Sequence, residues 1–411
     1  MYSIPLQAIT KVINEDGYIN IVIDQMIEIN ELSNHQRRLF TRIVYGTIEN
    51  KIYLDYLLKN LIKGKRLKPY LKNTLRMGTY MLKMMNLADH HIVNELVRMI
   101  KKQDYKGSQL INAVLRTLIN TPMPKLKTLP YLERLHIEYS IPWDLLNLLY
   151  TQYPTQIEEI LALKGEETNH FRINSLKTTP EAVSQKLSQD GINFFINGYH
   201  LSSKVNLVSY ELFNDGLITP QDPSSQRVAE VVNPKPNDLV LDGCSAPGGK
   251  AFHMASMMNN TGKIIACDIY PHKLRLIEEG SKRLGVNIIK TKLVDIRSYL
   301  SDELFDHVLI DAPCSGLGVI SHKVDLKYRM TLSKINDLIF LQQEILDYVA
   351  CLVKEGGYLT YSTCTINIGE NENQIQNFLR KHTLFKKIHE EKILPSIEND
   401  GFYICKMQRG S

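Results

Sequence analysis

Short apolar segments alternate with segments of helical periodicity over the second half of this chain, and this alternation limits its fold more than any other feature. A short apolar run bounded by turns is typical of a buried strand, whereas apolar residues three and four apart are typical of a helix. Strands that alternate with helices favour a doubly wound α/β fold, with a largely parallel sheet between helices. Strands are expected at 239–241, 263–267, 288–294, 307–310 and 358–361, and helices from about 249, at 271–284 and at 333–354.

The first 120 residues have a different pattern, with apolar residues at helical spacing and few strand signals. Three prolines between 121 and 130 indicate a linker. Helical periodicity is clear at 21–27, 39–48, 75–84 and 111–118. We expect a helical domain at 1–125, a linker region with two helices at 126–165, a small α+β subdomain at 166–232 and the α/β domain at 233–411. In the subdomain, strands at 171–174 and 194–196 flank a helix at 180–189.

Positive charge is concentrated in one part of the chain. The net charge is only +5, but residues 51–127 contain 16 basic and 4 acidic residues, an excess of +12, and the remainder sums to −7. A basic domain joined to a mildly acidic one indicates a polyanionic partner such as nucleic acid. A solvated, lysine-rich surface is the alternative interpretation.

Several protein classes are excluded by composition. No apolar stretch is long enough for a transmembrane helix, and the N-terminal residues lack the pattern of a secretory signal. The six cysteines lie at least 13 residues apart, so neither a disulfide scaffold nor a zinc or other metal site is expected. Free thiols fit a reducing cytoplasm, which is the predicted location.

Four acidic residues follow four successive expected strands. They are Asp242, Asp268, Asp295 and Asp311. Ligands of such sheets bind beyond the carboxyl ends of the strands. An acid after the second strand can accept hydrogen bonds from both hydroxyls of a ribose. The row of acids therefore predicts a ligand that contains a nucleoside.

The glycine-rich segment 242–250 narrows the choice of ligand. Its glycines allow close approach of the backbone, and the helix that follows offers free N–H groups. Ala251 follows Lys250, so the segment is not a phosphate-binding P-loop, and it lacks the dinucleotide pattern G-x-G-x-x-G. A simple tight turn is the alternative. S-adenosylmethionine, a nucleoside without a phosphate chain, fits best. The predicted cofactor-binding residues are Cys244, Ser245, Ala246, Pro247, Gly248, Gly249, Lys250, Asp268, Asp295 and Asp311.

Two cysteines also stand at expected strand ends. Cys314 follows Asp311, and Cys364 follows the strand at 358–361. Thiolates at such positions are candidate nucleophiles. For the other cysteines, packing as small apolar side chains is the favoured interpretation. These are Cys244, Cys267, Cys351 and Cys405.

Three of these segments resemble core motifs of the RNA 5-methylcytosine methyltransferases. They are Asp242–Lys250, Asp311–Gly318 and Tyr361–Thr365. Supporting matches are Arg172–Lys177, Gln221–Gln226, Glu370–Glu372 and Gly401–Ile404. The basic N-terminal region is similar to a NusB-like RNA-binding domain, with its best local matches at 94–95 and 110–116. Together they resemble the bacterial Sun/RsmB family of 16S ribosomal RNA methyltransferases.

This resemblance implies a Rossmann-like methyltransferase domain that uses S-adenosylmethionine to methylate C5 of a cytosine in 16S rRNA or a small-subunit precursor. The carried-over roles are Cys364 as the nucleophile that forms an adduct with C6, Asp311 as a proton-holding group at N3 of the base, Cys314 as the residue that assists product release, and Lys250 as a positioning group. For Lys250 a solvated side chain is the alternative. We expect a monomer that binds neither membrane nor DNA.

One family motif departs from its usual form. Where a proline and a tryptophan are usual, the segment 321–328 has Val324 and Tyr328, so its effect on substrate choice stays open. A different RNA target, such as tRNA or 23S rRNA, is also compatible with the motifs, and so is a non-catalytic RNA-binding assembly factor. A DNA cytosine methyltransferase would use the Pro313-Cys314 dipeptide for its nucleophile.

Overall fold

The computed structural model describes residues 2–62, 64, 66–85, 87–164 and 168–410. The chain forms two compact units. The helical unit is Met1–Ala162 with Lys323–Thr331, and the α/β unit is Leu163–His322 with Leu332–Ser411. The expected domain boundary at 165/166 lies outside the described residues. Within the described part of the chain, no helix has the length and apolar character needed to cross a membrane.

In its described residues, the helical unit begins with seven helices that contain all four expected helical segments. They are α1 (Ser3–Asn14), α2 (Ile19–Ile29), α3 (Asn34–Glu49), α4 (Lys51–Ile62), α5 (Pro69–Met84), α6 (Asp89–Lys101) and α7 (Tyr105–Asn120). The proline-rich segment contains only the short 3-10 helix η1 (Leu126–Thr128). Three helices follow instead of the expected two: α8 (Tyr131–Glu138), α9 (Trp143–Gln152) and α10 (Ile157–Ala162). Pro154 explains the extra break, because a proline disfavours helical backbone at the residue before it.

A short segment from much later in the chain completes the helical unit. Residues Lys323–Thr331, here called the strap, include the helix α16 (Leu326–Arg329). Val324 is buried in the same apolar core as residues of α1 to α7, and Tyr328 packs against that core. The two departures from the family motif are therefore residues with a packing role. Nothing in the sequence pattern indicated that this part of 233–411 folds with the helices.

Polar contacts fix the strap as well. The Tyr328 hydroxyl lies 3.0 Å from the carbonyl oxygen of Glu49 and 2.9 Å from that of Ser140, and can donate to either. The Lys51 ammonium lies 3.9 Å from the centre of the Tyr328 ring. Lys327 donates to the Tyr139 carbonyl at 3.0 Å, and burial lowers the pKa of Lys327 to about 8. The strap is thus held through both its apolar and its polar atoms.

The α/β unit contains a small antiparallel sheet in the order β2-β3-β1-β4. Its elements are β1 (Asn169–Ile173), α11 (Pro180–Gln189), β2 (Phe194–Asn197), β3 (His200–Ser203), η2 (Leu207–Ser209), α12 (Glu211–Asn214), β4 (Ile218–Pro220) and α13 (Pro223–Val232). Asn174 ties this sheet to the rest of the unit, because its side chain donates to the carbonyls of Gly216 at 2.8 Å and Leu284 at 2.9 Å.

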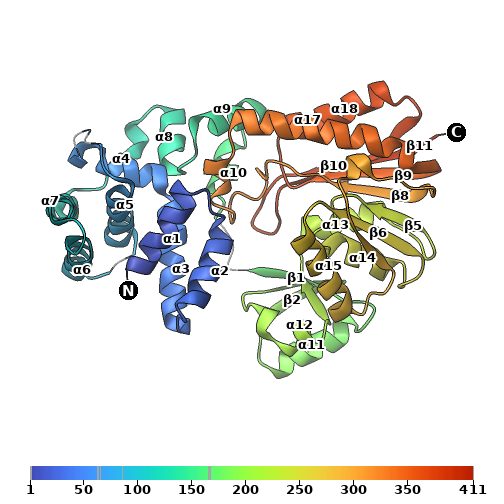
Figure 1. Cartoon of the computed structure of the whole chain (residues 1–411), viewed down its shortest axis with the longest axis horizontal. Helices are drawn as coiled ribbons and strands as arrows, with labels where there is room; N and C mark the ends of the chain where they lie inside the picture. Colours follow the sequence, from blue (N-terminus) through green and yellow to red (C-terminus); the bar gives the residue numbers. More distant parts are fainter. Residues whose placement is uncertain (1, 63, 65, 86, 165–167, 411) are drawn as a thin grey trace. The chain divides into compact units, whose positions relative to one another are not determined.

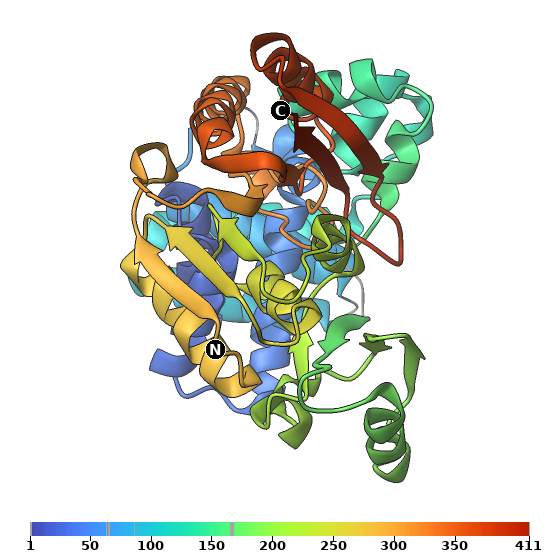
Figure 2. The same cartoon turned by 90° about the vertical axis from the view of Figure 1, so that its right-hand side faces the viewer.

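The large sheet of this unit has seven strands in the order β10-β11-β9-β8-β5-β6-β7. The five strands β9, β8, β5, β6 and β7 are parallel, as expected, whereas β11 and β10 add an antiparallel edge, drawn in dark red in Figure 2. The elements are β5 (Leu239–Asp242), α14 (Gly249–Met257), β6 (Lys263–Asp268), α15 (Pro271–Leu284), β7 (Ile289–Leu293), η3 (Ile296–Ser298), β8 (Phe305–Asp311), α17 (Leu332–Val349), η4 (Ala350–Leu352), β9 (Val353–Thr363), η5 (Ile368–Glu370), α18 (Glu372–Lys381), β10 (Phe385–Ile393) and β11 (Phe402–Arg409). The fold class expected from the sequence is confirmed.

Successive residues of each central strand pack into different cores. Val240 and Ile264 belong to the core with α13, α14 and α15, whereas their neighbours Leu241 and Ile265 belong to the core with α17 and α18. This alternation follows from the two-residue repeat of a strand, and it places helices on both faces of the sheet (Figure 1). Strand β10 was not predicted from the sequence, because this edge strand is rich in charged residues and lacks a buried apolar run.

Replacing Tyr328 with Phe tests the anchoring of the strap. The change keeps the ring in the core and removes a hydroxyl that lies between two carbonyl oxygens. We expect the free energy of unfolding to fall by about 1–2 kcal/mol, measured by urea denaturation. Tyr105→Phe, at an exposed tyrosine of α7, serves as the control and should leave stability unchanged. Equal stabilities of the two variants would contradict this account of the strap.

Candidate active site

The acidic residues predicted from the strand ends do meet at one edge of the large sheet. Asp242, Asp268 and Asp311 are the last residues of β5, β6 and β8, and parallel pairing brings these ends to the same side. Asp295 follows β7 at the same edge. These four acids come from segments spread over some 70 residues of sequence and share one rim because of the parallel topology.

The glycine-rich loop crosses this rim between β5 and α14. The Gly243 amide donates to the Leu309 carbonyl at 2.9 Å, and the Ser245 amide donates to the Cys267 carbonyl at 2.9 Å. Gly248 has a φ of +101°, and an added Cβ would lie 2.6 Å from the Phe252 ring. The loop therefore requires glycine there for both backbone and steric reasons. It leads directly into the N-terminus of α14, where backbone N–H groups can bind a ligand.

Asp242 is the least satisfied polar group of the site. It is 1% exposed, and among the described residues neither of its carboxylate oxygens nor the Ser245 hydroxyl has a hydrogen-bond partner of good geometry. Burial raises the pKa of the Asp242 carboxyl to about 7. Buried polar groups are usually paired. Unpaired acceptors beside a glycine-rich loop are therefore suited to the amino or hydroxyl groups of a bound nucleoside cofactor.

Asp268 and Asp295 differ in how far their carboxylate oxygens are free to bind a ligand. Asp268 is buried, accepts a hydrogen bond from the Tyr270 amide at 3.0 Å, and lies 3.8 Å from the Lys273 ammonium. Asp295 is held by Arg297 at 2.6 Å, and this hydrogen-bonded guanidinium lowers the pKa of the Asp295 carboxyl. A ligand contact by Asp295 would have to share its oxygens with Arg297, so its role in cofactor binding stays a prediction.

The two cysteines expected to carry the chemistry are adjacent in space. The sulfurs of Cys314 and Cys364 lie 3.4 Å apart, although the residues are 50 positions apart in the sequence. The hydrogen bond with Cys364, together with burial, raises the pKa of the Cys314 thiol well above its usual range. Cys314 is thus held as a protonated thiol beside the second sulfur. Burial also raises the pKa of Cys244, whose sulfur is suited to packing and not to nucleophilic attack.

Lys250 and Asp311 form an ion pair next to these sulfurs. The Lys250 ammonium donates to one oxygen of Asp311 at 2.6 Å, and the Ser362 hydroxyl donates to the other at 2.8 Å. Burial alone would lower the pKa of Lys250, but the negative charges of Asp311 and Cys364 outweigh burial and raise it. By reciprocity the ammonium stabilises a thiolate at Cys364. Lys250 is 11% exposed in its side chain, so the alternative of a freely solvated lysine does not describe it.

Sequence reasoning assigned no role to Ser362, Glu370 and Asn371. Ser362 contacts Asp311 directly, whereas Glu370 and Asn371 contact residues next to the two cysteines. Ser362 lies two residues before Cys364 on β9, opposite Asp311 in the strand register. Glu370 and Asn371 lie in a stretch noted only for its family resemblance. In the sequence, Glu370 and Asn371 are visible as part of a short run of polar residues, and the fold buries both side chains. Among the described residues, no group of three or more His, Cys, Asp or Glu side chains is arranged to hold a metal ion.

Comparison with known proteins agrees with this arrangement. A family model described as 16S rRNA methyltransferase RsmB/F matches residues 229–408, and the NusB family model matches residues 3–120. The probable ribosomal RNA small subunit methyltransferase B of Bacillus subtilis is 33% identical over 439 residues, covering 99% of this chain and 98% of the relative. The chain belongs to the ribosomal RNA small subunit methyltransferase B family. The family resemblance read from the sequence is thereby confirmed.

Other members of this methyltransferase B family and several solved structures are also similar. The family protein of Proteus mirabilis is 29% identical, with 99% of this chain and 98% of the relative covered. The crystal structure of PH0851 matches with a TM-score of 0.84 and 26% identity over 99% of this chain and 97% of that one. NSun6 from Pyrococcus horikoshii, solved with SFG, has a TM-score of 0.59 and 23% identity, covers 66% of this chain and 98% of its own, and supports the fold alone.

Replacing Asp242 with Asn tests whether burial raises the pKa of the Asp242 carboxyl. The folded chain binds the Asp242 proton more tightly than the unfolded chain, so this stabilising effect is complete below about pH 4 and is lost as the pH rises through about 7. The Asn variant does not titrate. Relative to the unmodified protein, it should therefore gain up to about 3 kcal/mol of unfolding free energy between pH 5 and pH 8.

Urea denaturation at both pH values, without added cofactor, measures this difference. Asp302→Asn, at an exposed loop position, is the control and should give the same difference at both pH values. A pH-independent difference for Asp242→Asn as well would show that the Asp242 carboxyl keeps an ordinary pKa.

Proposed function

We propose that this protein transfers the methyl group of S-adenosylmethionine to C5 of a cytosine in the RNA of the small ribosomal subunit. The observation that carries the proposal is the 3.4 Å approach of the Cys314 and Cys364 sulfurs beside the Lys250–Asp311 ion pair. The names of the curated relatives support small-subunit RNA as the substrate. The methyltransferase activity named for the family model and for the curated relatives supports S-adenosylmethionine as the methyl donor.

Two cysteines suit this reaction because cytosine C5 is a weak nucleophile. Addition of the Cys364 thiolate to C6 makes C5 electron-rich, which is a form of covalent catalysis. S-adenosylmethionine, when bound, supplies the electrophilic methyl group. The C5 proton must then leave, and its electron pair expels the Cys364 sulfur from C6. Cys314, whose sulfur lies next to that sulfur, is positioned to assist this release.

The remaining groups of the site act on charge and position. An ammonium has three donors, so Lys250 can hold Asp311 and a polar atom of the base together. In this proposal Asp311 holds a proton near N3 of the base, which offsets the charge that develops as the thiolate adds. Asp242, Ser245 and Asp268 are assigned to the cofactor. The target cytosine must be unstacked, because C6 is not accessible in a paired helix.

Opposite outcomes for the two cysteines test the catalytic part of the proposal. Cys364→Ala should abolish both methylation and any covalent RNA–protein complex, because no adduct can form at C6. In the Cys314→Ala variant, Cys364 should still add to C6 and the methyl group should still be transferred, but the methylated RNA should stay attached to Cys364. Denaturing electrophoresis with labelled cofactor and small-subunit RNA measures both.

The double variant should give no covalent band, since trapping requires the first addition, and the two losses should be non-additive. Cofactor binding, measured by calorimetry, serves as the control for folding in every variant. A band that accumulates with Cys364→Ala and not with Cys314→Ala would reverse the two roles and favour the chemistry of the DNA enzymes.

The basic helical unit is assigned to RNA binding. Lys101, Lys102 and Lys106 are exposed around the end of α6 and the start of α7. Affinity for RNA falls as the salt concentration rises. Replacing all three with Gln should make this dependence shallower, by about 2–3 in the slope of log affinity against log salt, because fewer counterions are released. The control replaces exposed Lys282, Lys290 and Lys386 of the α/β unit in the same way. Equal slopes for the two triple variants would contradict an RNA-binding role for the helical lysines.

A further inference from the structure

Glu370 is a fully buried carboxylate that joins the two cysteine loops. Its first oxygen accepts hydrogen bonds from the Ser315 amide at 2.8 Å and the Gln342 side chain at 3.1 Å. Its second oxygen accepts from the Ser315 hydroxyl at 2.5 Å and the Asn367 side chain at 3.0 Å. Ser315 directly follows Cys314, and Asn367 lies three residues after Cys364. One side chain thus holds both loops.

The two loops also contact each other at the same point. The hydroxyls of Ser315 and Thr365 lie 2.8 Å apart, and Thr365 directly follows Cys364. The backbone carbonyl of Glu370 accepts a hydrogen bond from the buried Tyr361 hydroxyl at 2.8 Å, which fixes Glu370 relative to β9. The residue after each cysteine is therefore part of one hydrogen-bonded cluster centred on Glu370.

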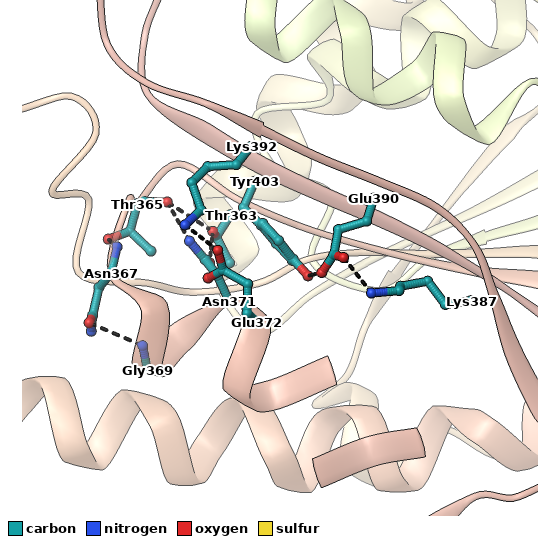
Figure 3. Close-up of polar contacts among 10 residues, drawn as sticks. All are labelled: Thr363, Thr365, Asn367, Gly369, Asn371, Glu372, Lys387, Glu390, Lys392 and Tyr403. Carbon is teal, nitrogen blue, oxygen red and sulfur yellow. Dashed lines mark hydrogen bonds and ion pairs between the residues drawn. The ribbon is translucent and has the colours of Figure 1, made fainter. Parts of the chain in front are cut away.

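The side chain of Asn371 forms hydrogen bonds with both Thr363 and Thr365 (Figure 3). The Thr363 hydroxyl donates to the side-chain oxygen of Asn371 at 2.6 Å, and the side-chain nitrogen of Asn371 donates to the Thr365 carbonyl at 2.8 Å. Thr363 and Thr365 are the immediate neighbours of Cys364. With both neighbours held by one buried amide, the backbone at Cys364 has little freedom to move.

We propose that Glu370 and Asn371 are positioning residues that set the distance between the Cys314 and Cys364 sulfurs. Glu370 holds the Cys314 loop through Ser315, and Asn371 holds Cys364 through its two neighbours. The relevance of that distance to catalysis rests on the proposed function, because Cys314 must reach the sulfur that leaves C6. The geometric claim itself stands on the hydrogen bonds alone.

The chemistry of the cluster explains why residue 370 is a carboxylate. A carboxylate accepts about four hydrogen bonds and donates none, which matches the donors of Ser315, Gln342 and Asn367. A glutamine of the same shape would direct its own NH2 group at some of these donors. A buried carboxylate costs free energy unless such partners are present. Glu370→Gln is therefore a conservative change in size that disrupts the joint between the loops.

The rate of disulfide formation between Cys314 and Cys364 measures this distance without any RNA or cofactor. Diamide oxidises two neighbouring thiols to one disulfide and takes up both hydrogens as it is reduced to a hydrazine. The exposed Cys351 is replaced by Ser in every variant, so that it does not react. Peptide mapping then follows the pair. We expect Glu370→Gln and Asn371→Ala to slow its formation about tenfold, the factor that corresponds to about 1.4 kcal/mol.

Glu372→Gln is the matched control. Glu372 lies in the same acidic stretch, but it forms an ion pair with Lys392 on β10, outside the two cysteine loops (Figure 3). It should oxidise at the rate of the unmodified protein. Ser315→Ala, which removes only the hydroxyl that contacts Glu370, is the second variant and should also slow the reaction if Glu370→Gln does not fold.

The direction of the change in oxidation rate distinguishes a changed position of the sulfurs from the loss of the Glu370 charge. The negative charge of Glu370 contributes to the raised pKa of the Cys314 thiol, so removing it would by itself increase the thiolate fraction and speed oxidation. Slower oxidation in Glu370→Gln therefore reports a greater separation or mobility of the sulfurs. Unchanged or faster oxidation in Glu370→Gln, Asn371→Ala and Ser315→Ala would overturn the proposal.

Methylation assays of the same variants test the link to catalysis. With cofactor affinity unchanged, kcat should fall by about 10²-fold, the usual consequence of misplacing a reacting group by about 1 Å. A slower oxidation with kcat unaffected would overturn the catalytic part of the proposal. If the unmodified protein methylates no RNA, the proposed function fails, and the oxidation rates still decide the geometric claim.

Discussion

The parallel pairing of β8 with β9 is the interaction on which the site depends. It places Asp311 opposite Ser362, and the loops that leave these two strand ends carry Cys314 and Cys364. Strand pairing is fixed by the buried faces of the sheet, because a slip of one residue would turn apolar side chains away from their cores. The position of the two sulfurs thus follows from the packing of Val308, Leu309 and Ile310 of β8 in the two cores.

Much of this arrangement could be predicted from the sequence, because it follows from local periodicity. Apolar runs indicated the parallel strands, and parallel strands must end at one edge, so the acids at their ends were expected there. The roles of Glu370 and Asn371 could not be predicted, because they depend on which residues of distant loops become their hydrogen-bond partners. Edge strand β10 was missed for a related reason, since a solvated edge does not require an apolar pattern.

Two buried carboxylates of the α/β unit show how environment separates roles. Glu370 has a donor for nearly every lone pair and is suited to hold backbone loops in place. Asp242, at the end of β5, is buried without such donors, and this raises its pKa to about 7. A carboxylate whose oxygens all accept hydrogen bonds contributes to rigidity. A buried carboxylate without such donors raises the free energy of the unliganded protein, and a bound ligand can remove this penalty by supplying donors.

The strap has a consequence for the order in which the chain can fold during synthesis. Domains commonly fold as units as they leave the ribosome, the N-terminal one first. Here the helical unit is made first, yet Val324 and Tyr328, which complete its core and its polar contacts, are synthesised some 160 residues after α10. By then β5 to β8 have already been translated. The helical unit therefore reaches its final packing only after four of the five parallel strands have been synthesised, and until then its unfinished apolar surface stays uncovered by the strap.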